Sequence, residues 1–315
     1  MTFDLGRFLS SQGRLVETEL RRLLARRTAA PIPFLAPAPP RVKDSMLYSL
    51  MAGGKRLRPA LVMTAAECCG LPGRRALKTA CALEMIHTYS LIHDDLPAMD
   101  DDDLRRGKPT NHKVYGEALA ILAGDALLTL AFELAAENAA DLRLDGRSAA
   151  ELVRVIAAGS GARGMVGGQV ADIDAEGWSD AMLRRAGGRE ARGLIDYIHT
   201  HKTAALITAS LEAGAVLAGA SPARRAALRD YGLATGLAFQ IADDVLDVVG
   251  DKKKLGKRGS DSENRKLTYV RIYGLERSRE LARTLAQKAR RRVAVFGAKA
   301  EPLLALADFI VSRDR

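Results

Sequence analysis

Helical periodicity fills almost the whole of this sequence, which leaves little room for a fold built on sheets. Apolar residues recur at helical spacing, whereas runs of alternating apolar and polar residues, typical of strands, are nearly absent. A leucine-rich stripe predicts one helix from Leu5 to Arg27, and the helical pattern resumes at Arg41 and persists to the end of the chain. The sequence therefore predicts an all-α fold class, a single-domain multi-helix bundle of roughly ten to thirteen helices.

Proline and glycine mark the breaks between these helices. Residues 31–40 hold five prolines, and we expect this Pro-rich loop to interrupt any helix. Further breaks are predicted near Gly70 to Gly73, Asp141 to Gly146, Glu176 to Ser179, Ala220 to Pro222, and in the charged loop Asp251 to Arg265. With 48% hydrophobic residues the 315-residue chain can bury one large core, so we expect residues 1–315 to form a single domain.

The cysteines and the N-terminus indicate a compartment. Cys68, Cys69 and Cys81 form neither a disulfide framework nor zinc spacing, which favours a reducing environment. The first residues lack the pattern of a secretory signal, and the long apolar stretch from Ala204 to Ala218 is interrupted by Glu212. We therefore expect a cytoplasmic protein with no stable membrane anchor.

The charge distribution is uneven. The chain carries a net charge of +10, yet six aspartates and no basic residue lie between Asp94 and Asp103. Nucleic-acid-binding proteins usually interleave a basic stripe with aromatic residues for stacking, and only 5% of this chain is aromatic. The pattern argues against nucleic acid as a partner. An acidic run alone is most often a solvated loop.

A second acidic group changes that interpretation. Asp243 and Asp247 stand four residues apart and Asp244 lies between them, so one predicted helix carries converging carboxylates. The flanking residues are apolar, which predicts a buried wall where carboxylates need partners. Clusters that offer only oxygen ligands suit Mg²⁺, which shares its shell with phosphate oxygens, and neither group has the spacing of an EF-hand.

Basic residues stand near both acidic groups and could bind the remaining phosphate oxygens. They are Lys55, Arg56 and Arg58 in the segment Gly53 to Pro59, Arg105 and Arg106 after the first acidic run, and Lys202, Lys257 and Lys266 around the second. Two nucleotide-binding patterns are rejected: Gly54-Lys55 is followed by Arg56 rather than Ser or Thr, and the G-x-G-x-x-G at Gly159 to Gly164 lies in helical sequence.

Together these motifs resemble one family, the trans-isoprenyl diphosphate synthases, in its bacterial farnesyl diphosphate synthase type. Asp94-Asp95-x-x-x-x-Asp100 followed by Leu104-Arg105-Arg106-Gly107 is similar to the first aspartate-rich motif of that family, and Asp243-Asp244-x-x-Asp247 to the second. The resemblance extends from about Ser45 to Arg315 and includes the sequence segments Gly53 to Pro59, Gly164 to Gln169, His201 to Thr203 and Lys266 to Tyr269. One departure is Val270, where the family commonly has proline, and this is expected to loosen the segment that carries Lys266.

The resemblance implies an isoprenoid synthase fold, a helical bundle around a deep central cavity, usually as a homodimer. It implies about three Mg²⁺ ions per active site, with Asp94, Asp100 and Asp243 as principal ligands and Asp95, Asp244 and Asp247 in support. By position it implies that isopentenyl diphosphate is held by Lys55, Arg58, His87 and Arg106, and the allylic diphosphate by Arg105, Lys202, Thr203, Gln240 and Lys257, with Lys266 as a further substrate-binding residue. For His87, taken without the resemblance, an ordinary core histidine is the alternative.

The implied reaction is ionisation, condensation and elimination. Arg105 and Lys202 would stabilise the departing diphosphate, and the dipoles of Thr203 and Gln240 would stabilise the allylic cation without trapping it. Tyr89, an aromatic residue five positions before Asp94 with small Ser90 beside it, favours a C15 product, farnesyl diphosphate. The alternatives are a C20 geranylgeranyl diphosphate synthase, a class I terpene cyclase, and a non-catalytic helical or metal-binding subunit.

Overall fold

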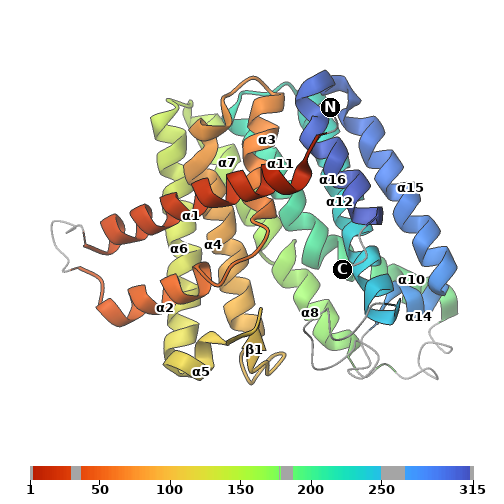
Figure 1. The fold of residues 1–315 in the computed structure, drawn as a ribbon, viewed down its shortest axis with the longest axis horizontal. Coiled ribbons are helices and arrows are strands. Elements are labelled where there is room, and N and C mark those ends of the chain that lie inside the picture. Colours follow the sequence, from red (N-terminus) through yellow and green to blue (C-terminus); the bar gives the residue numbers. More distant parts are fainter. Residues whose placement is uncertain (1–2, 30–36, 177, 179–186, 250–266, 313–315) are drawn as a thin grey trace.

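Nearly all of the regular structure is helical, which confirms the predicted fold class (Figure 1). The protein was studied as a computed structural model, which describes residues 3–29, 37–176, 178, 187–249 and 267–312. The longer α-helices are α1 (Leu5–Ala29), α2 (Pro40–Leu50), α3 (Leu57–Cys68), α4 (Leu77–Asp94), α6 (Glu117–Asp141), α7 (Gly146–Ser160), α8 (Met165–Ala175), α10 (Gly187–Ile198), α11 (Ala205–Leu217), α12 (Pro222–Val249), α15 (Leu275–Val293) and α16 (Glu301–Ser312). The short elements are η1 (Gly73–Ala76), α5 (Asn111–Tyr115), η2 (His199–Ala204), α14 (Tyr269–Tyr273), η3 (Ala294–Ala300), and the strands β1 (Leu104–Arg105) and β2 (Lys108–Pro109).

Most of the predicted breaks lie between helices as expected, and two boundaries differ. Helix α1 ends at Ala29, two residues later than predicted. Helix α2 begins at Pro40, one residue earlier than the sequence pattern indicated, because proline fits the first helical position, where its missing N–H costs nothing. Residues 30–36 of the Pro-rich loop and the charged loop at 251–265 lie outside the described residues.

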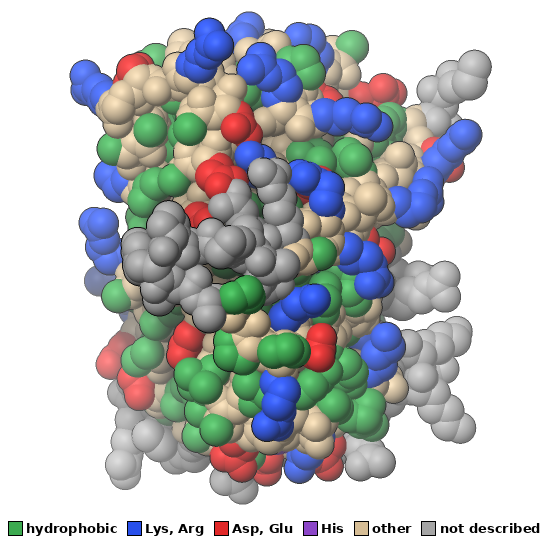
Figure 2. Space-filling view, turned by 90° about the vertical axis from the view of Figure 1, so that its left-hand side faces the viewer, with side chains coloured by type: hydrophobic (Ala, Val, Ile, Leu, Met, Phe, Trp, Pro, Cys, Tyr) green, Lys and Arg blue, Asp and Glu red, His purple; other side chains and the backbone are tan. Residues whose placement is uncertain are grey.

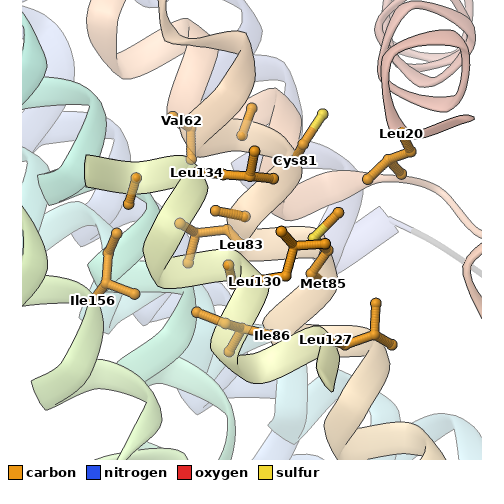
Figure 3. Packing of buried hydrophobic residues seen from close by; sticks show 14 of the residues in the cluster. Leu20, Val62, Cys81, Leu83, Met85, Ile86, Leu127, Leu130, Leu134 and Ile156 are labelled. Atoms are coloured by element: carbon orange, nitrogen blue, oxygen red, sulfur yellow. The ribbon is translucent and has the colours of Figure 1, made fainter. Parts of the chain in front are cut away.

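Helix α4 lies at the centre of the largest apolar core (Figure 3). Its residues Leu83, Met85 and Ile86 are fully buried against Leu127 and Leu134 of α6, among other residues of that core. Each such side chain stabilises the fold by about 1.5–3 kcal/mol relative to an exposed one. The helix that carries the first aspartate motif is therefore held rigidly along its length.

Helix α11 lies close to three neighbouring helices, and a glycine makes each approach possible. A Cβ at Gly214 of α11 would collide with the carbonyl oxygen of Val62 in α3. A Cβ at Gly159 of α7 would collide with Ala209, and one at Gly232 of α12 with Thr208. Gly159, which opens the G-x-G-x-x-G sequence, therefore serves helix packing, in agreement with the rejection of a nucleotide-binding motif.

The helices α4 and α12, which carry the two aspartate motifs, run to the same end of the bundle, the lower end in Figure 1. At that end the β1–β2 hairpin follows α4 directly. On the side of the molecule seen in Figure 2, basic side chains are spread singly and hydrophobic ones gather in the lower half. Helix α6 is long and apolar enough to cross a membrane by length and composition alone, but it packs along α4 in the core.

Candidate functional site

The first aspartate motif begins at the C-terminal end of α4. Asp94 is the last residue of the helix, and the backbone N–H of Asp100 donates to its carbonyl oxygen at 2.8 Å, which folds the acidic loop back onto the helix end. Burial raises the pKa of Asp94 to about 6, Lys202 opposes this, and Asp100 adds to it. Lys202 of η2 and Asp100 therefore belong to the electrostatic surroundings of Asp94.

Asp95 faces the protein interior instead. Its side chain is 5% exposed, and its Oδ1 accepts from Nε of Arg105 at 2.6 Å and pairs with Nη2 at 2.5 Å. Such a two-pronged contact fixes the plane of the guanidinium group. Asp95 therefore orients Arg105, one of the residues predicted to hold the allylic diphosphate.

The β1–β2 hairpin directs the side chains of the adjacent residues Arg105 and Arg106 to different partners. Leu104 pairs with Pro109 and Arg105 with Lys108, and the two residues between the strands, Arg106 and Gly107, both have positive φ angles (54° and 75°). Positive φ at both central positions is the mark of a type I′ turn. Arg105 thereby contacts Asp95, whereas Nη1 of Arg106 donates to the carbonyl oxygen of Gly53.

The second aspartate motif lies near the end of α12. As in the first motif, one of two adjacent aspartates is buried and the other is partly exposed. Asp243 and Asp247 are partly exposed, whereas the side chain of Asp244 is 2% exposed. The Oδ2 of Asp244 accepts from the backbone N–H of Tyr269 at 2.8 Å and lies 3.8 Å from Nε2 of His199. Asp244 thus ties α12 to α14, although Val270 stands there instead of proline.

A π-helix presents Lys202 and Thr203 to the site. Element η2 has π-helical hydrogen bonding between α10 and α11, and such segments recur at functional sites. Nζ of Lys202 lies 2.5 Å from Oδ2 of Asp172 in α8, and the hydroxyl of Thr203 donates to Oε1 of Gln240 at 2.9 Å. A Cβ at Gly168 would collide with the backbone nitrogen of Lys202, so α8 packs directly against this segment.

A pocket of basic groups lies beside the first motif. Burial lowers the pKa of Arg58 to about 10, and its Nε has no hydrogen-bond partner among the described residues. Burial, with Arg58 and Arg106 nearby, holds the pKa of His87 well below 6.5. Burial also lowers the pKa of Arg106. Burial and mutual repulsion disfavour the charged forms of these groups, and a bound anion would restore them. The pocket therefore suits a phosphate group.

The remaining predicted residues have other neighbours. Nζ of Lys55 lies 5.1 Å from the centre of the Phe309 ring in α16. Tyr89 is buried in the core around α4, and the hydroxyl of Ser90 donates to the carbonyl oxygen of His87 at 2.9 Å. Lys257 and Lys266 lie outside the described residues, so their roles stay predictions.

The donor chemistry of the site fits Mg²⁺ bound together with a diphosphate. In the part of the chain that the structure describes, no group of three or more acidic, histidine or cysteine side chains is gathered closely enough to hold a metal ion alone. Mg²⁺ commonly binds one or two carboxylates and completes its shell with water and phosphate oxygens. Asp94 at the end of α4, whose pKa burial raises, and the partly exposed Asp243 of α12 are candidates for such carboxylates. The individual metal ligands remain predictions.

Sequence patterns did not reveal several contacts that support the site. Arg56, expected among the cations that meet phosphate oxygens, is instead buried on Glu84, because its side chain turns into the core. His199 and Tyr269 are buried beside Asp244, and Asp172 forms the ion pair with Lys202. These contacts depend on which segments fold against one another.

Comparisons with known proteins agree with this geometry. A profile of the polyprenyl synthetase family matches residues 39–299. The chain is 44% identical over 313 residues to a geranylgeranyl diphosphate synthase of Cyanophora paradoxa, covering 99% of this chain and 97% of the relative. It is 41% identical over 312 residues to a farnesyl diphosphate synthase of Geobacillus stearothermophilus, covering 99% and 98%.

A solved structure shows the same fold with ligands. A geranyltransferase of Helicobacter pylori, complexed with magnesium and isoprenyl diphosphate, superposes with a TM-score of 0.75 at 30% identity and covers 98% of this chain and 97% of its own. The family match over most of the chain agrees with the two aspartate motifs, the basic pocket and the all-helical fold. The chain therefore belongs to the polyprenyl synthetase family, the trans-isoprenyl diphosphate synthases, and is a prenyltransferase that elongates prenyl diphosphate chains.

Proposed function

We propose that this prenyltransferase condenses isopentenyl diphosphate with dimethylallyl and geranyl diphosphate and stops at the C15 product, farnesyl diphosphate. The observation that carries the assignment of substrates is the basic pocket of Arg58, His87 and Arg106 beside Asp94, with the Nε of Arg58 buried and unpartnered among the described residues. This arrangement supports two neighbouring anion sites, one at the basic pocket and one between the aspartate motifs.

The allylic diphosphate is placed between the two motifs. Arg105, oriented by Asp95, and Lys202, held by Asp172, bind its diphosphate and stabilise the negative charge that develops as the C–O bond breaks. Asp94, Asp100 and Asp243 would hold Mg²⁺, which would supply further positive charge to the same leaving group. Because charge develops mainly in the transition state, these contacts lower the barrier more than they stabilise the bound substrate.

The allylic cation needs dipoles and must not meet a strong nucleophile. The Thr203 hydroxyl donates to the Gln240 amide, so both polar groups are held in place near the reacting carbon. Isopentenyl diphosphate, held in the Arg58 pocket, attacks through its double bond, and holding both substrates makes the step effectively unimolecular. The departed diphosphate then takes the proton, which leaves a new double bond and restores neutrality at carbon.

The volume below the first motif sets the product length. Tyr89 lies about 7.5 Å along the helix axis from Asp94, at 1.5 Å per residue. It is buried among core residues and its ring meets that of His93 edge to face, with centres 5.7 Å apart. A chain growing down the predicted cavity from Asp94 would meet this ring, and this supports C15. Relatives include both farnesyl and geranylgeranyl diphosphate synthases, so C20 is the alternative.

A product assay tests both the activity and its length. The protein is incubated with Mg²⁺, isopentenyl diphosphate and a C5, C10 or C15 allylic primer, and chain lengths are measured by chromatography. We expect C15 from the first two primers and no extension of the third. Tyr89→Ala should lengthen the product because it removes the ring, whereas Tyr89→Phe should keep C15 because it retains the volume. A C20 product from the unaltered protein would refute the proposed C15 product length. A C15 product from Tyr89→Ala would show that another residue limits the chain length.

We propose further that the enzyme is a cytoplasmic homodimer. Ile121 and Leu122 on α6 are large apolar residues exposed in the single chain, and the partly buried Leu128 and Phe132 extend this face. An exposed apolar helix face favours burial against a second copy. Light scattering should give twice the chain mass, and Leu122→Glu should shift it toward the monomer. A monomeric unaltered protein would contradict the dimer.

The three free cysteines support the proposed cytoplasmic location, since free thiols are typical of a reducing compartment.

A further inference from the structure

The loop between α2 and α3 leads directly into the first turn of α3, which carries Arg58 of the basic pocket, and a buried side chain holds this loop in place. Gly53 and Gly54 have positive φ angles of 90° and 126°, which only glycine adopts easily. Arg56, two residues on, also has a positive φ, 48°, which is disfavoured for any residue with a Cβ. A loop with this backbone needs contacts from its surroundings to keep one conformation.

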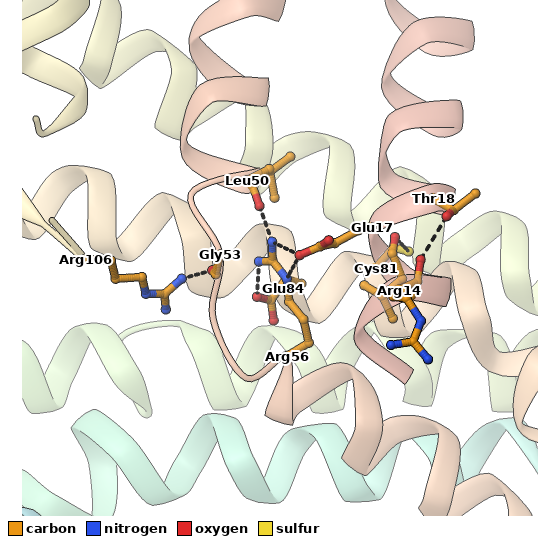
Figure 4. Close-up of polar contacts among 10 residues, drawn as sticks. Arg14, Glu17, Thr18, Leu50, Gly53, Arg56, Cys81, Glu84 and Arg106 are labelled. Carbon is orange, nitrogen blue, oxygen red and sulfur yellow. Dashed lines mark hydrogen bonds and ion pairs between the residues drawn. The ribbon is translucent and has the colours of Figure 1, made fainter. Parts of the chain in front are cut away.

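Arg56 supplies those contacts (Figure 4). Its Nη1 donates to Oε1 of Glu84 at 2.8 Å, and its Nη2 donates to the carbonyl oxygen of Leu50 at 2.5 Å and to Oε1 of Glu17 at 2.9 Å. The side chain is 2% exposed, so it is turned away from any ligand. Arg56 thus joins the loop to α1, to the end of α2 and to α4.

Glu84 connects this anchor to the other half of the pocket. It lies in α4 three residues before His87, on the same side of the helix. Its side chain is 4% exposed, and its negative charge also favours the protonated forms of Arg58 and Arg106. Through Arg56, the residue before α3, one carboxylate therefore links the start of the helix that carries Arg58 to the helical turn that carries His87.

We infer that the buried Arg56–Glu84 pair is a positioning device for the isopentenyl diphosphate pocket, which fixes the separation of Arg58 from His87. The inference rests on the proposed function, because it concerns one of the two substrate sites proposed there. Neither residue touches the substrate. The allylic site depends on Arg105, Lys202 and Asp172, none of which contacts this pair through the bonds described above.

Steady-state kinetics with each substrate varied in turn tests this role. Glu84→Gln keeps an oxygen that can accept from Arg56 but removes the charge, and Arg56→Lys keeps the charge but removes the fork of donors. For both variants we expect the KM for isopentenyl diphosphate to rise about tenfold or more, while the KM for the allylic substrate stays within about twofold. Glu17→Gln should show a smaller rise of the same kind, since Glu17 is partly exposed and Glu84 still holds Arg56.

A matched variant separates positioning from general loss of stability. Arg225 of α12 pairs with Glu151 of α7 at 2.6 Å, remote from the loop in sequence and partly buried. Arg225→Lys should lower the melting temperature and leave both KM values unchanged. Thermal stabilisation by isopentenyl diphosphate alone gives a second measurement, and it should weaken only in the Arg56 and Glu84 variants.

The outcomes distinguish the two proposals. If the unaltered protein makes no product from isopentenyl and allylic diphosphates with Mg²⁺, the proposed function fails. If it is active but the Arg56 and Glu84 variants raise both KM values equally, or lower only the melting temperature as Arg225→Lys does, the positioning role is overturned.

Discussion

Adjacent aspartates in this protein have different surroundings. In the first motif the charge of Lys202 acts on Asp94, whereas Asp95 is buried and forms an ion pair with Arg105. In the second motif Asp243 is partly exposed, whereas Asp244 is buried on the backbone of Tyr269. Successive helical residues point about 100° apart, so a pair of neighbours on a helix cannot share one direction. We therefore expect the first aspartate of each pair to be available to a metal, whereas the next one holds a neighbouring segment.

The difference predicts unequal responses to amide substitution in the second motif. Asp243→Asn should raise the Mg²⁺ concentration for half-maximal activity about tenfold or more, because a ligand loses its charge. Asp244→Asn should leave that concentration near the original value, since the amide oxygen can still accept from Tyr269, and should instead lower the melting temperature. Magnesium titrations of both variants measure this. Equal shifts in the two titrations would show that Asp244 is a ligand as well.

The residues that could be predicted from the sequence are those whose chemistry is local. Six aspartates within ten residues, or a lysine next to two glycines, can be recognised directly in the sequence. The pairing of Asp244 with Tyr269, 25 residues away, is not, because it depends on how two segments pack. Burial of Arg56 was equally hidden, since an arginine among other basic residues is typical of an exposed surface.

At the scale of elements, helix limits were largely predictable and irregular segments were not. Proline and glycine marked the helix ends, as the start of α12 at Pro222 illustrates. The π-helical turn at His199–Ala204 has no such mark, because its hydrogen bonding is imposed by neighbours. Two of those neighbours are Gly168 and Gly236, whose missing Cβ atoms make room for Lys202 and Ala204. The two-residue strands were too short for any periodic pattern.

This packing predicts a large effect from one methyl group. Gly168→Ala would push α8 against the backbone of Lys202, and we expect it to displace Lys202 and Thr203 and to lower kcat at least tenfold. Gly193→Ala is the matched control, because Gly193 lies in α10 with open space around it. It should leave kcat unchanged and stabilise the fold by up to about 1 kcal/mol. Similar kcat values in both variants would contradict the importance of this contact.

The whole molecule should lose stability in mild acid through its buried histidines. Burial, with Arg58 and Arg106 nearby, holds the pKa of His87 well below 6.5, and burial lowers that of His199 to about 3. In the unfolded chain both pKa values return to about 6.5. Because the unfolded state then binds more protons, the free energy of unfolding falls as the pH drops below about 6.5.

Denaturant unfolding at several pH values measures this linkage. Each histidine should contribute a slope of about 1.4 kcal/mol per pH unit between pH 6 and pH 5. His87→Gln should flatten the curve by that amount relative to the unaltered protein, since glutamine does not titrate. Parallel curves would mean that His87 is already protonated in the folded state.

Helix α4 carries Glu84, His87, Tyr89 and Asp94 within three turns of one rigid rod. Inserting or deleting one residue between them would rotate every later position by about 100° and shift it by 1.5 Å, which would turn Asp94, the predicted metal ligand, away from the site. During evolution, the product length of such an enzyme can therefore change through the size of single side chains on α4, but not through a change in the length of this helix. The spacing along α4 acts as an inherited constraint, and only the size of the residues on it is free to evolve.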